Sequence, residues 1–197
     1  SQTGHDKNLI QETVKTGALN STQKNDEKKA NQKSVNLDGI YSLAPLMDSF
    51  IALAGQSSIE TLLDKFFKEC FSYCTFENAY IFIINQGKME CLGGRNNKGD
   101  NIISENEGIC KQAIRNALIT KKNVFVEDAV NDSEYRLVSS VYKRKIKTIY
   151  VSSYQDIKCH SILYLETINE KAELSLNIRE ALKYLQRFVI ASIGCKL

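Results

Sequence analysis

The stretch that decides the fold is Ile146–Glu166, which reads IKTIYVSSY, QDIKCH and SILYLE in three consecutive parts. The first and last parts are rich in β-branched and aromatic residues, and the middle part is a short polar turn, which is the pattern of a β-hairpin. Apolar residues occupy both faces of each run, so we expect other layers to cover both sides of a hairpin in the middle of a sheet. One face of the first run carries Ile146, Thr148, Tyr150 and Ser152 and the other Ile149 and Val151, while Ile162 and Tyr164 oppose Leu163 and Leu165 in the second run.

An amphipathic helix is predicted to follow this hairpin. Ser175 suits its N-cap and Gly194 its C-cap. The apolar positions between them step by four and three residues, which gives a seam long enough to pack on the sheet and on a neighbouring helix. The seam consists of Ile178, Leu182, Leu185, Val189 and Ser192.

The segment Ser161–Glu166 and the helix after it resemble the C-terminal half of a GAF domain. GAF modules of multidomain sensor kinases carry the signature G-(I/V)-L-Y-L-E-N at this place. Here Ser161 replaces the glycine and Thr167 stands where asparagine is common. The resemblance covers roughly Ser57 to Gly194. It implies an α+β fold, with an antiparallel β-sheet of about five to six strands flanked by helices and the N- and C-terminal helices packed on one face.

Two helices are predicted before the sheet. The first starts near Ser42, accommodates Pro45 in its first turn and ends at Gly55. The second follows the sequence SSIE, in which Ser57 and Glu60 form a capping box. Two consecutive helices that lead into a sheet are similar to the start of a GAF domain. The apolar face of the second helix contains Ile59, Leu62, Leu63, Phe66, Phe67 and Cys70.

More strands and a covering region are predicted between these helices and the hairpin. Ala79–Ile84 is apolar on both faces, which favours another central strand, and Met89–Leu92 returns after a turn as its partner. Gly93–Ile103 is polar and Gly-rich, so we expect a loop or lid there. The remaining predicted elements are a capping box at Ser104–Glu107, a helix Gly108–Ile119, a short strand Asn123–Val126 and a helix through Tyr135, Val138 and Val141.

Composition limits the function classes. The 197 residues carry a net charge of +3, which does not favour nucleic acid or an anionic membrane as a partner. No apolar run approaches the roughly 20 residues that a membrane span needs. We expect residues 1–37 to be a flexible polar linker or tail, 38–56 an N-terminal connecting helix and 57–197 the GAF-like sensory domain. The chain begins with Ser1 and shows no signal-peptide core, which suggests a cytoplasmic piece of a longer protein.

The six cysteines are scattered, which suits reduced thiols better than a disulfide framework. Cys70 and Cys74 have the i, i+4 spacing of half a metal site. No second Cys/His pair completes such a site, so we expect buried structural thiols and no metal. His160 has no second structured histidine as a partner and is predicted to be a surface or turn histidine.

Cys110 is the main candidate for catalysis. The segment Gly108-Ile109-Cys110 resembles the G-V-C-G segment at a helix start in the free methionine sulfoxide reductases, which are GAF-like enzymes that need a reactive thiolate. That family's catalytic cysteine lies before the central hairpin, whereas residues 132–145 here contain no cysteine and Lys111 replaces the last glycine. No Ser/His/Asp set or phosphate-binding loop is present. We therefore expect no enzyme, with this reductase as the less favoured alternative.

Three further motifs bear on ligands. Cys159-His160 is similar to the bilin-attachment dipeptide of phytochromes, but it falls in a turn where the thiol would point away from a pocket. Asn97-Lys98 occurs without the rest of the cyclic-nucleotide set of phosphodiesterase GAF domains. The basic run Tyr142–Lys147 could hold a phosphate or an acidic partner. We favour a solvated helix end, where cations suit the helix dipole.

The predicted site is a small-molecule pocket on the sheet face opposite the terminal helices. Its floor would be one row of the central hairpin, roofed by the region before it. The alternative is a collapsed pocket filled by the same side chains. The floor hydroxyls would come from Tyr150, Ser152 and Tyr164, and the lid from Ile109, Cys110, Ala113 and Tyr135.

The resemblance implies a sensory or regulatory domain of a larger signalling protein, such as a two-component sensor kinase or a cyclase. In the resembling sensors, the terminal helices pair between two chains and pass a change on to an output domain. We expect the helix from Ser42 to shift against the helix from Leu176 when the pocket changes. The expected partners are a small-molecule ligand, a second copy of the chain and an output domain. The alternative is a ligand-free dimerisation or interaction module.

Overall fold

The computed structural model describes residues 44–102, 108–157 and 159–194. All of them belong to one of the two units into which the chain divides, residues 32–197. The expected linker at residues 1–37 and the capping box at residues 104–107 lie outside the described residues. Among the described helices, none is long and apolar enough to cross a membrane.

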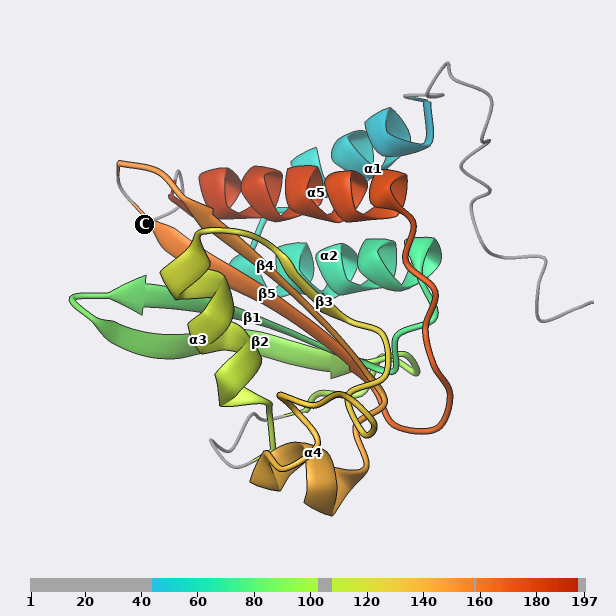
Figure 1. The fold of residues 1–197 in the computed structure, drawn as a ribbon. Coiled ribbons are helices and arrows are strands. Elements are labelled where there is room, and N and C mark those ends of the chain that lie inside the picture. The colour runs from blue at the N-terminus through green and yellow to red at the C-terminus, as the bar shows by residue number, and fades with distance from the viewer. Residues whose placement is uncertain (1–43, 103–107, 158, 195–197) are drawn as a thin grey trace, which may run out of the picture. The chain divides into compact units, whose positions relative to one another are not determined.

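A five-stranded antiparallel sheet forms the middle of the fold, in the order β2-β1-β5-β4-β3 (Figure 1). Helices lie on both faces, so the predicted α+β architecture is confirmed. The strands are β1 (Asn78–Asn85), β2 (Lys88–Asn96), β3 (Val124–Val126), β4 (Thr148–Gln155) and β5 (His160–Thr167). The helices are α1 (Ala44–Ala54), α2 (Ile59–Tyr73), α3 (Lys111–Thr120), α4 (Ser139–Arg144) and α5 (Leu176–Gly194).

The predicted central hairpin is the pair β4 and β5. Strand β5 lies between β1 and β4, with Tyr164 opposite Tyr80 on one side and Val151 on the other. Residues 161–167 of β5 are all buried, because helices cover both faces of this strand. The hairpin therefore occupies the interior position that its two apolar faces predict.

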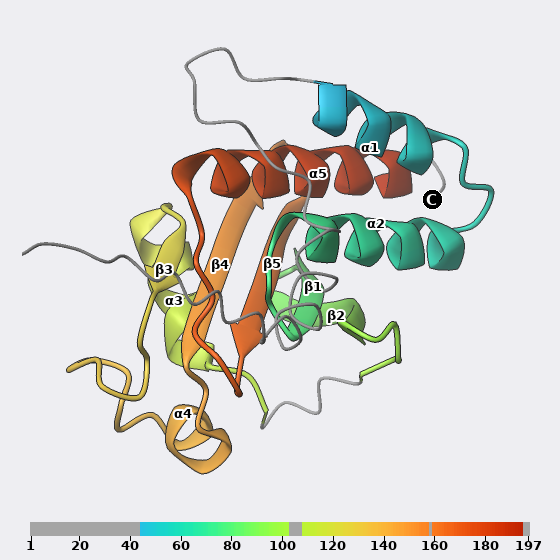
Figure 2. The same ribbon diagram turned by 90° about the vertical axis from the view of Figure 1, so that its right-hand side faces the viewer.

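The helices α1, α2 and α5 form a layer on one face of the sheet, as predicted for the terminal helices (Figure 2). Ser175 caps α5 by accepting a hydrogen bond from the Ile178 N–H. Helix α1 packs on α5 through the stacked rings of Phe50 and Phe188, whose centroids lie 5.1 Å apart. The fully buried residues of the α5 seam are Leu182, Leu185 and Val189.

The other face of the sheet is covered by α3, α4 and the turns around Tyr135. Three predicted boundaries in and before this region are corrected. Helix α3 begins at Lys111 rather than Gly108, with Cys110 as an N-cap that makes no side-chain hydrogen bond. Tyr135 and Val138 lie in turns before α4 rather than in a helix. The capping box of α2 consists of Ser58 and Thr61, one residue beyond the predicted pair, because the Ser58 side chain accepts from the Thr61 N–H at 3.1 Å.

The predicted loop Gly93–Ile103 is also corrected, because its first four residues continue β2. Gly94 in this segment serves close approach rather than a turn. A Cβ atom on Gly94 would lie 2.6 Å from the Tyr80 ring and 2.7 Å from the Ile102 carbonyl oxygen. Gly94 thus lets the Tyr80 ring and the returning segment at Ile102 close over the edge of the sheet.

Replacing Gly94 with alanine is expected to lower the free energy of unfolding by about 1–3 kcal/mol, because one of the two clashing partners is backbone. Gly93→Ala is the matched control. Its Cβ would meet Leu63 at 3.4 Å and Phe67 at 3.7 Å, which are ordinary contacts. Urea unfolding of both variants measures the difference. Equal losses in the two variants would contradict this account of Gly94.

Candidate functional site

The segments that cover the sheet face opposite α1, α2 and α5, which are residues 108–110, α3, the turns around Tyr135 and α4, are called the roof below. A buried polar network lies between the sheet and this roof, and Glu166 is at its centre. Glu166 is fully buried at the end of β5. One carboxylate oxygen, Oε1, accepts from Arg144 Nη2 at 2.6 Å and from Asn78 Nδ2 at 3.1 Å. The other, Oε2, accepts from the Tyr164 hydroxyl at 2.9 Å. Both oxygens of this buried acid are therefore satisfied, by side chains from β1, β5 and α4.

The same network holds the roof in place. The Tyr164 hydroxyl accepts a hydrogen bond from the Cys110 N–H at 3.0 Å. Arg144 also donates to the Gly108 carbonyl oxygen. The segment Gly108–Cys110 is thus tied directly to the central strand through Tyr164, and indirectly through Arg144 and Glu166.

Burial sets the electrostatics of this network. It raises the pKa of the Tyr164 hydroxyl, and the adjacent Glu166 carboxylate adds to the effect. Burial also raises the pKa of Glu166, with Arg144 acting in the opposite direction. Tyr164 is therefore a neutral hydroxyl at pH 7, and the charge of Arg144 favours the ionised form of Glu166 against the effect of burial.

Five of the seven residues predicted for the pocket come together at this face. Four form the roof and the fifth, Tyr164, lies on the sheet below them. All five are at most 5% exposed. The side chains thus fill the space between roof and floor, which favours the collapsed arrangement in this state. The roof residues are Ile109, Cys110, Ala113 and Tyr135.

The other two predicted residues, Tyr150 and Ser152, lie on the opposite face and are not part of this cluster. The Tyr150 hydroxyl donates to the Arg179 carbonyl oxygen on α5 at 3.3 Å. Tyr150 packs in the core between the sheet and the helices α1, α2 and α5, which is called the helix-side core below. Successive strand residues point to opposite faces. Since Val151 is opposite Tyr164 and shares its face, Tyr150 and Ser152 must point toward α5.

Sequence reasoning missed Glu166 and Arg144. The spacing signal for Glu166 was present, since it lies two residues beyond Tyr164 and so shares its face. Arg144 belongs to the basic run that was interpreted as a solvated helix end. That interpretation holds for the exposed Lys143 and Lys145 but is wrong for Arg144, whose guanidinium pairs with the buried acid. Tyr80 and Phe82 of β1 also line this face.

Three of the described cysteines, Cys70, Cys74 and Cys110, are buried in the cores on the two faces of the sheet. Cys70 and Cys74 are buried in the helix-side core, as predicted. Cys110 is fully buried, and burial raises its pKa, which disfavours the thiolate. Cys159 is half-buried and packs against the helix-side core, away from the roofed face. In the described part of the chain, no group of three or more His, Cys, Asp and Glu side chains could hold a metal ion.

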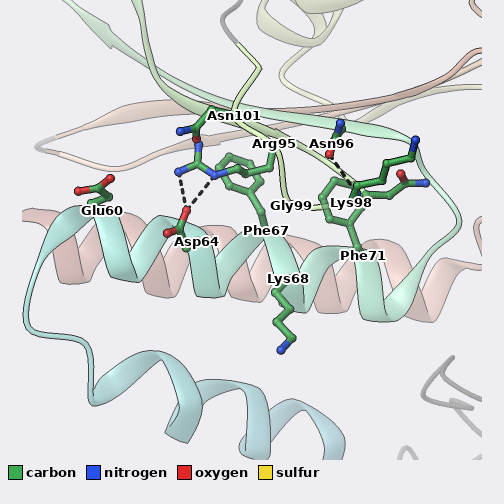
Figure 3. A pocket seen from close by; sticks show the side chains of 11 residues that line it. Glu60, Asp64, Phe67, Lys68, Phe71, Arg95, Asn96, Lys98, Gly99 and Asn101 are labelled. Carbon is green, nitrogen blue, oxygen red and sulfur yellow. Dashed lines mark hydrogen bonds and ion pairs between the residues drawn. The ribbon is translucent and has the colours of Figure 1, made fainter.

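Open pockets lined by described residues lie elsewhere on the domain. One, of about 480 Å³, lies between α2 and the turn after β2 (Figure 3). Phe67 and Phe71 line its floor, and the Asp64–Arg95 ion pair crosses it. A second pocket, of about 470 Å³, lies at the other edge of the sheet, near the ends of α3 and β4.

Comparison with known proteins identifies the fold. No family model and no curated protein matches this sequence. Among solved structures, the chain is similar to the GAF domain of an Acinetobacter phosphoenolpyruvate-protein phosphotransferase, at 11% identity and a TM-score of 0.56, over 77% of this chain and 92% of that one. It is also similar to the GAF domain of a two-component sensor histidine kinase from Bacillus halodurans, at 12% identity and a TM-score of 0.50, over 72% and 100%.

A third similar structure is an enzyme. It is the free methionine-R-sulfoxide reductase from Neisseria meningitidis in complex with its substrate, at 14% identity and a TM-score of 0.50, over 73% of this chain and 83% of that one. Identities this low establish the architecture and leave the activity open. Together with the sheet order and the layers on both faces, these similarities show that the described part of this chain has the fold of a GAF domain.

Proposed function

We propose that this chain is a sensory or regulatory domain of a larger signalling protein. A change at its roofed face would be passed to its terminal helices. The observation that supports this is the Glu166 network, since it joins the roof to the same strand that contacts α5 on the other side. The proposed organisation is a linker at residues 1–37, a connecting helix at 38–56 and the sensory domain at 57–197.

The route across the sheet runs through Gln186 of α5. Its side-chain Nε2 donates to the Ser161 hydroxyl at 3.0 Å and to the Ser152 carbonyl oxygen at 3.4 Å. Gln186 is fully buried, so these contacts fix α5 against the central hairpin. Tyr164 lies on the opposite face of the same strand, three residues from Ser161. A shift of β5 caused by the roof would therefore move the support of α5.

A small molecule is the proposed signal, with Ile109, Cys110, Ala113, Tyr135 and Tyr164 as its contacts. Tyr150 and Ser152 are left out because they face α5. The ligand would take the place of roof side chains and meet the Tyr164 hydroxyl beside the Glu166–Arg144 pair. Such a setting suits a compact molecule with both a donor and an acceptor group on an apolar body.

The proposed assembly is a cytoplasmic homodimer through α1 and α5, with an output domain of a two-component or related pathway in the same protein. Helix α1 exposes Met47 by 52% and Ile51 by 69%, four residues apart on one side of the helix. A ligand-free dimerisation module is the second candidate function, because the roofed face is filled by its own side chains. We propose no enzymatic activity, since Cys110 is buried with a raised pKa.

Thermal unfolding with a panel of amino acids, nucleotides and small aromatic compounds tests the proposal. A specific ligand at about 100 times its dissociation constant adds about 2.7 kcal/mol to the folded state, and its effect should be much weaker in Tyr164→Phe. The panel includes free methionine sulfoxide with a thiol reductant, and turnover of it would contradict the non-enzymatic assignment. A dimer that no compound stabilises would favour the second function.

A further inference from the structure

The pocket of about 470 Å³ is a hollow at the open edge of the sheet. Strand β3 pairs through Val124–Val126 with Ile149–Val151 of β4 and ends there. Beyond that point, residues 153–155 of β4 line the hollow together with residues from the end of α3 and from α5. The lining residues are Leu118, Lys121, Lys122, Asn123, Ser153, Tyr154, Gln155, His160, Lys183 and Arg187.

Four of these ten lining side chains are cationic and none is acidic. Lys121 and Lys122 come from the end of α3, and Lys183 and Arg187 lie four residues apart on α5. Two carboxylates lie just outside the lining. Glu180 pairs with Lys183 at 3.4 Å, and Asp156 accepts from the Tyr154 hydroxyl at 3.2 Å.

Three of the four cations keep their charge available. Within the described part of the chain, Lys121, Lys122 and Arg187 make no ion pair with a carboxylate. The Arg187 guanidinium instead lies 5.0 Å from the centre of the Tyr154 ring, which orients it without neutralising it. In the other pocket, by contrast, Arg95 is already bound to Asp64 by two hydrogen bonds (Figure 3).

Neutral hydrogen-bonding groups also line this hollow. Ser153 Oγ and His160 Nε2 lie 3.0 Å apart on neighbouring strands. The Asn123 amide donates to the Tyr150 hydroxyl at 3.3 Å. A lining that combines four cations with hydroxyl, amide and imidazole groups matches the needs of an oxyanion with several acceptor oxygens.

We propose that this basic pocket binds a small anion that carries phosphate groups. Its volume is in the range of pockets for small ligands, and its four lining cations come from the end of α3 and from α5. A flat basic surface would suit a nucleic acid or a membrane better. The proposal does not depend on the roofed site, because none of the residues of the Glu166 network lines this pocket.

Titration calorimetry on the full chain tests the proposal with inorganic pyrophosphate, a nucleoside triphosphate and the corresponding uncharged nucleoside as probes. We expect the two anions to bind and the nucleoside not to bind, with affinity falling as salt is raised. Equal affinity for both anions would assign recognition to the phosphates alone, and tighter triphosphate binding would add the base as a contact. Both results support the proposal.

Lys122→Glu and Arg187→Glu should each weaken anion binding roughly ten- to hundredfold, because each removes a charge-assisted hydrogen bond. Lys143→Glu is the matched control, since it makes the same charge change on the exposed side of α4. Tyr164→Phe should bind the anions normally. The proposal is overturned if neither anion binds, if the control weakens binding as much, or if only single-stranded DNA or anionic vesicles bind.

Discussion

Replacing Arg144 with alanine is expected to lower the free energy of unfolding by about 3–5 kcal/mol at about pH 8, the cost of leaving a buried charge without its partner. Glu166 is fully buried, and Arg144 is its cationic partner in the described part of the chain, at 2.6 Å. The Arg144 side chain is 28% exposed, so water will replace part of the lost interaction and place the value toward the lower end. Urea unfolding gives the difference directly.

The loss of stability in Arg144→Ala should depend on pH, and the direction of this dependence follows from the protonation of Glu166. Burial already raises the pKa of Glu166, and removal of Arg144 takes away the main influence that lowers it. A carboxyl group with a raised pKa in the folded state binds a proton more tightly when folded. The variant therefore regains stability as the pH falls from about 8 toward the ordinary value of 4.5, and loses it as the pH rises.

Two controls separate this account from a general effect of helix α4. Lys143→Ala changes the neighbouring exposed cation and should stay within about 0.5 kcal/mol of the parent protein. Glu166→Gln added to Arg144→Ala removes the buried charge and should abolish the extra pH dependence. An Arg144→Ala variant with parent-like stability at all pH values would show that the pair does not support the roof.

The central hairpin was predictable because both of its strands carry apolar residues on both faces, and only an interior position satisfies such a pattern. The same property hid the direction of each side chain. Tyr150 and Val151 are equally suited to burial, so the alternation along β4 could not say which of them faces the roof. The contacts of Tyr150 with α5 decide it, and these depend on tertiary packing.

Two further features of the site were not predictable for a physical reason. The partner of Glu166 comes from α4, whose position over β5 no local pattern encodes. Gly94 resembles a loop residue in composition, yet it lies in β2, where it pairs with Tyr80 of β1 and where the Tyr80 ring and the Ile102 backbone leave no room for a Cβ atom. Local sequence predicts which elements form, whereas close approach between distant segments appears only when the chain is folded.

Replacing Leu53 with alanine is expected to cost about 2–5 kcal/mol, since Leu53 is 1% exposed and anchors α1 in the helix-side core. The Ser49 hydroxyl also ties α1 to α2, through hydrogen bonds to Glu69 at 2.6 Å and Tyr73 at 3.1 Å. Because Leu53→Ala weakens the packing of α1, the amides of α1 should exchange faster in this variant than in the parent protein, while the amides of β4 and β5 stay protected longest. Equal loss of protection in α1 and in the sheet would instead mean that α1 and the sheet unfold together.

Ile51 is the matched control on the same helix, and it also tests the proposed dimer. Ile51 is 69% exposed, so Ile51→Ala should change the stability of the protomer by at most about 0.5 kcal/mol. Ile51→Glu places a charge on the exposed side shared with Met47, and in a dimer through α1 it would bury that charge in the interface. We therefore expect light scattering to show a shift from dimer to monomer for Ile51→Glu, with the protomer fold intact. A parent protein that is monomeric at all concentrations would rule out the homodimer. That result would leave the contacts between the roof and α5 within one chain unaffected, because they do not depend on a second copy.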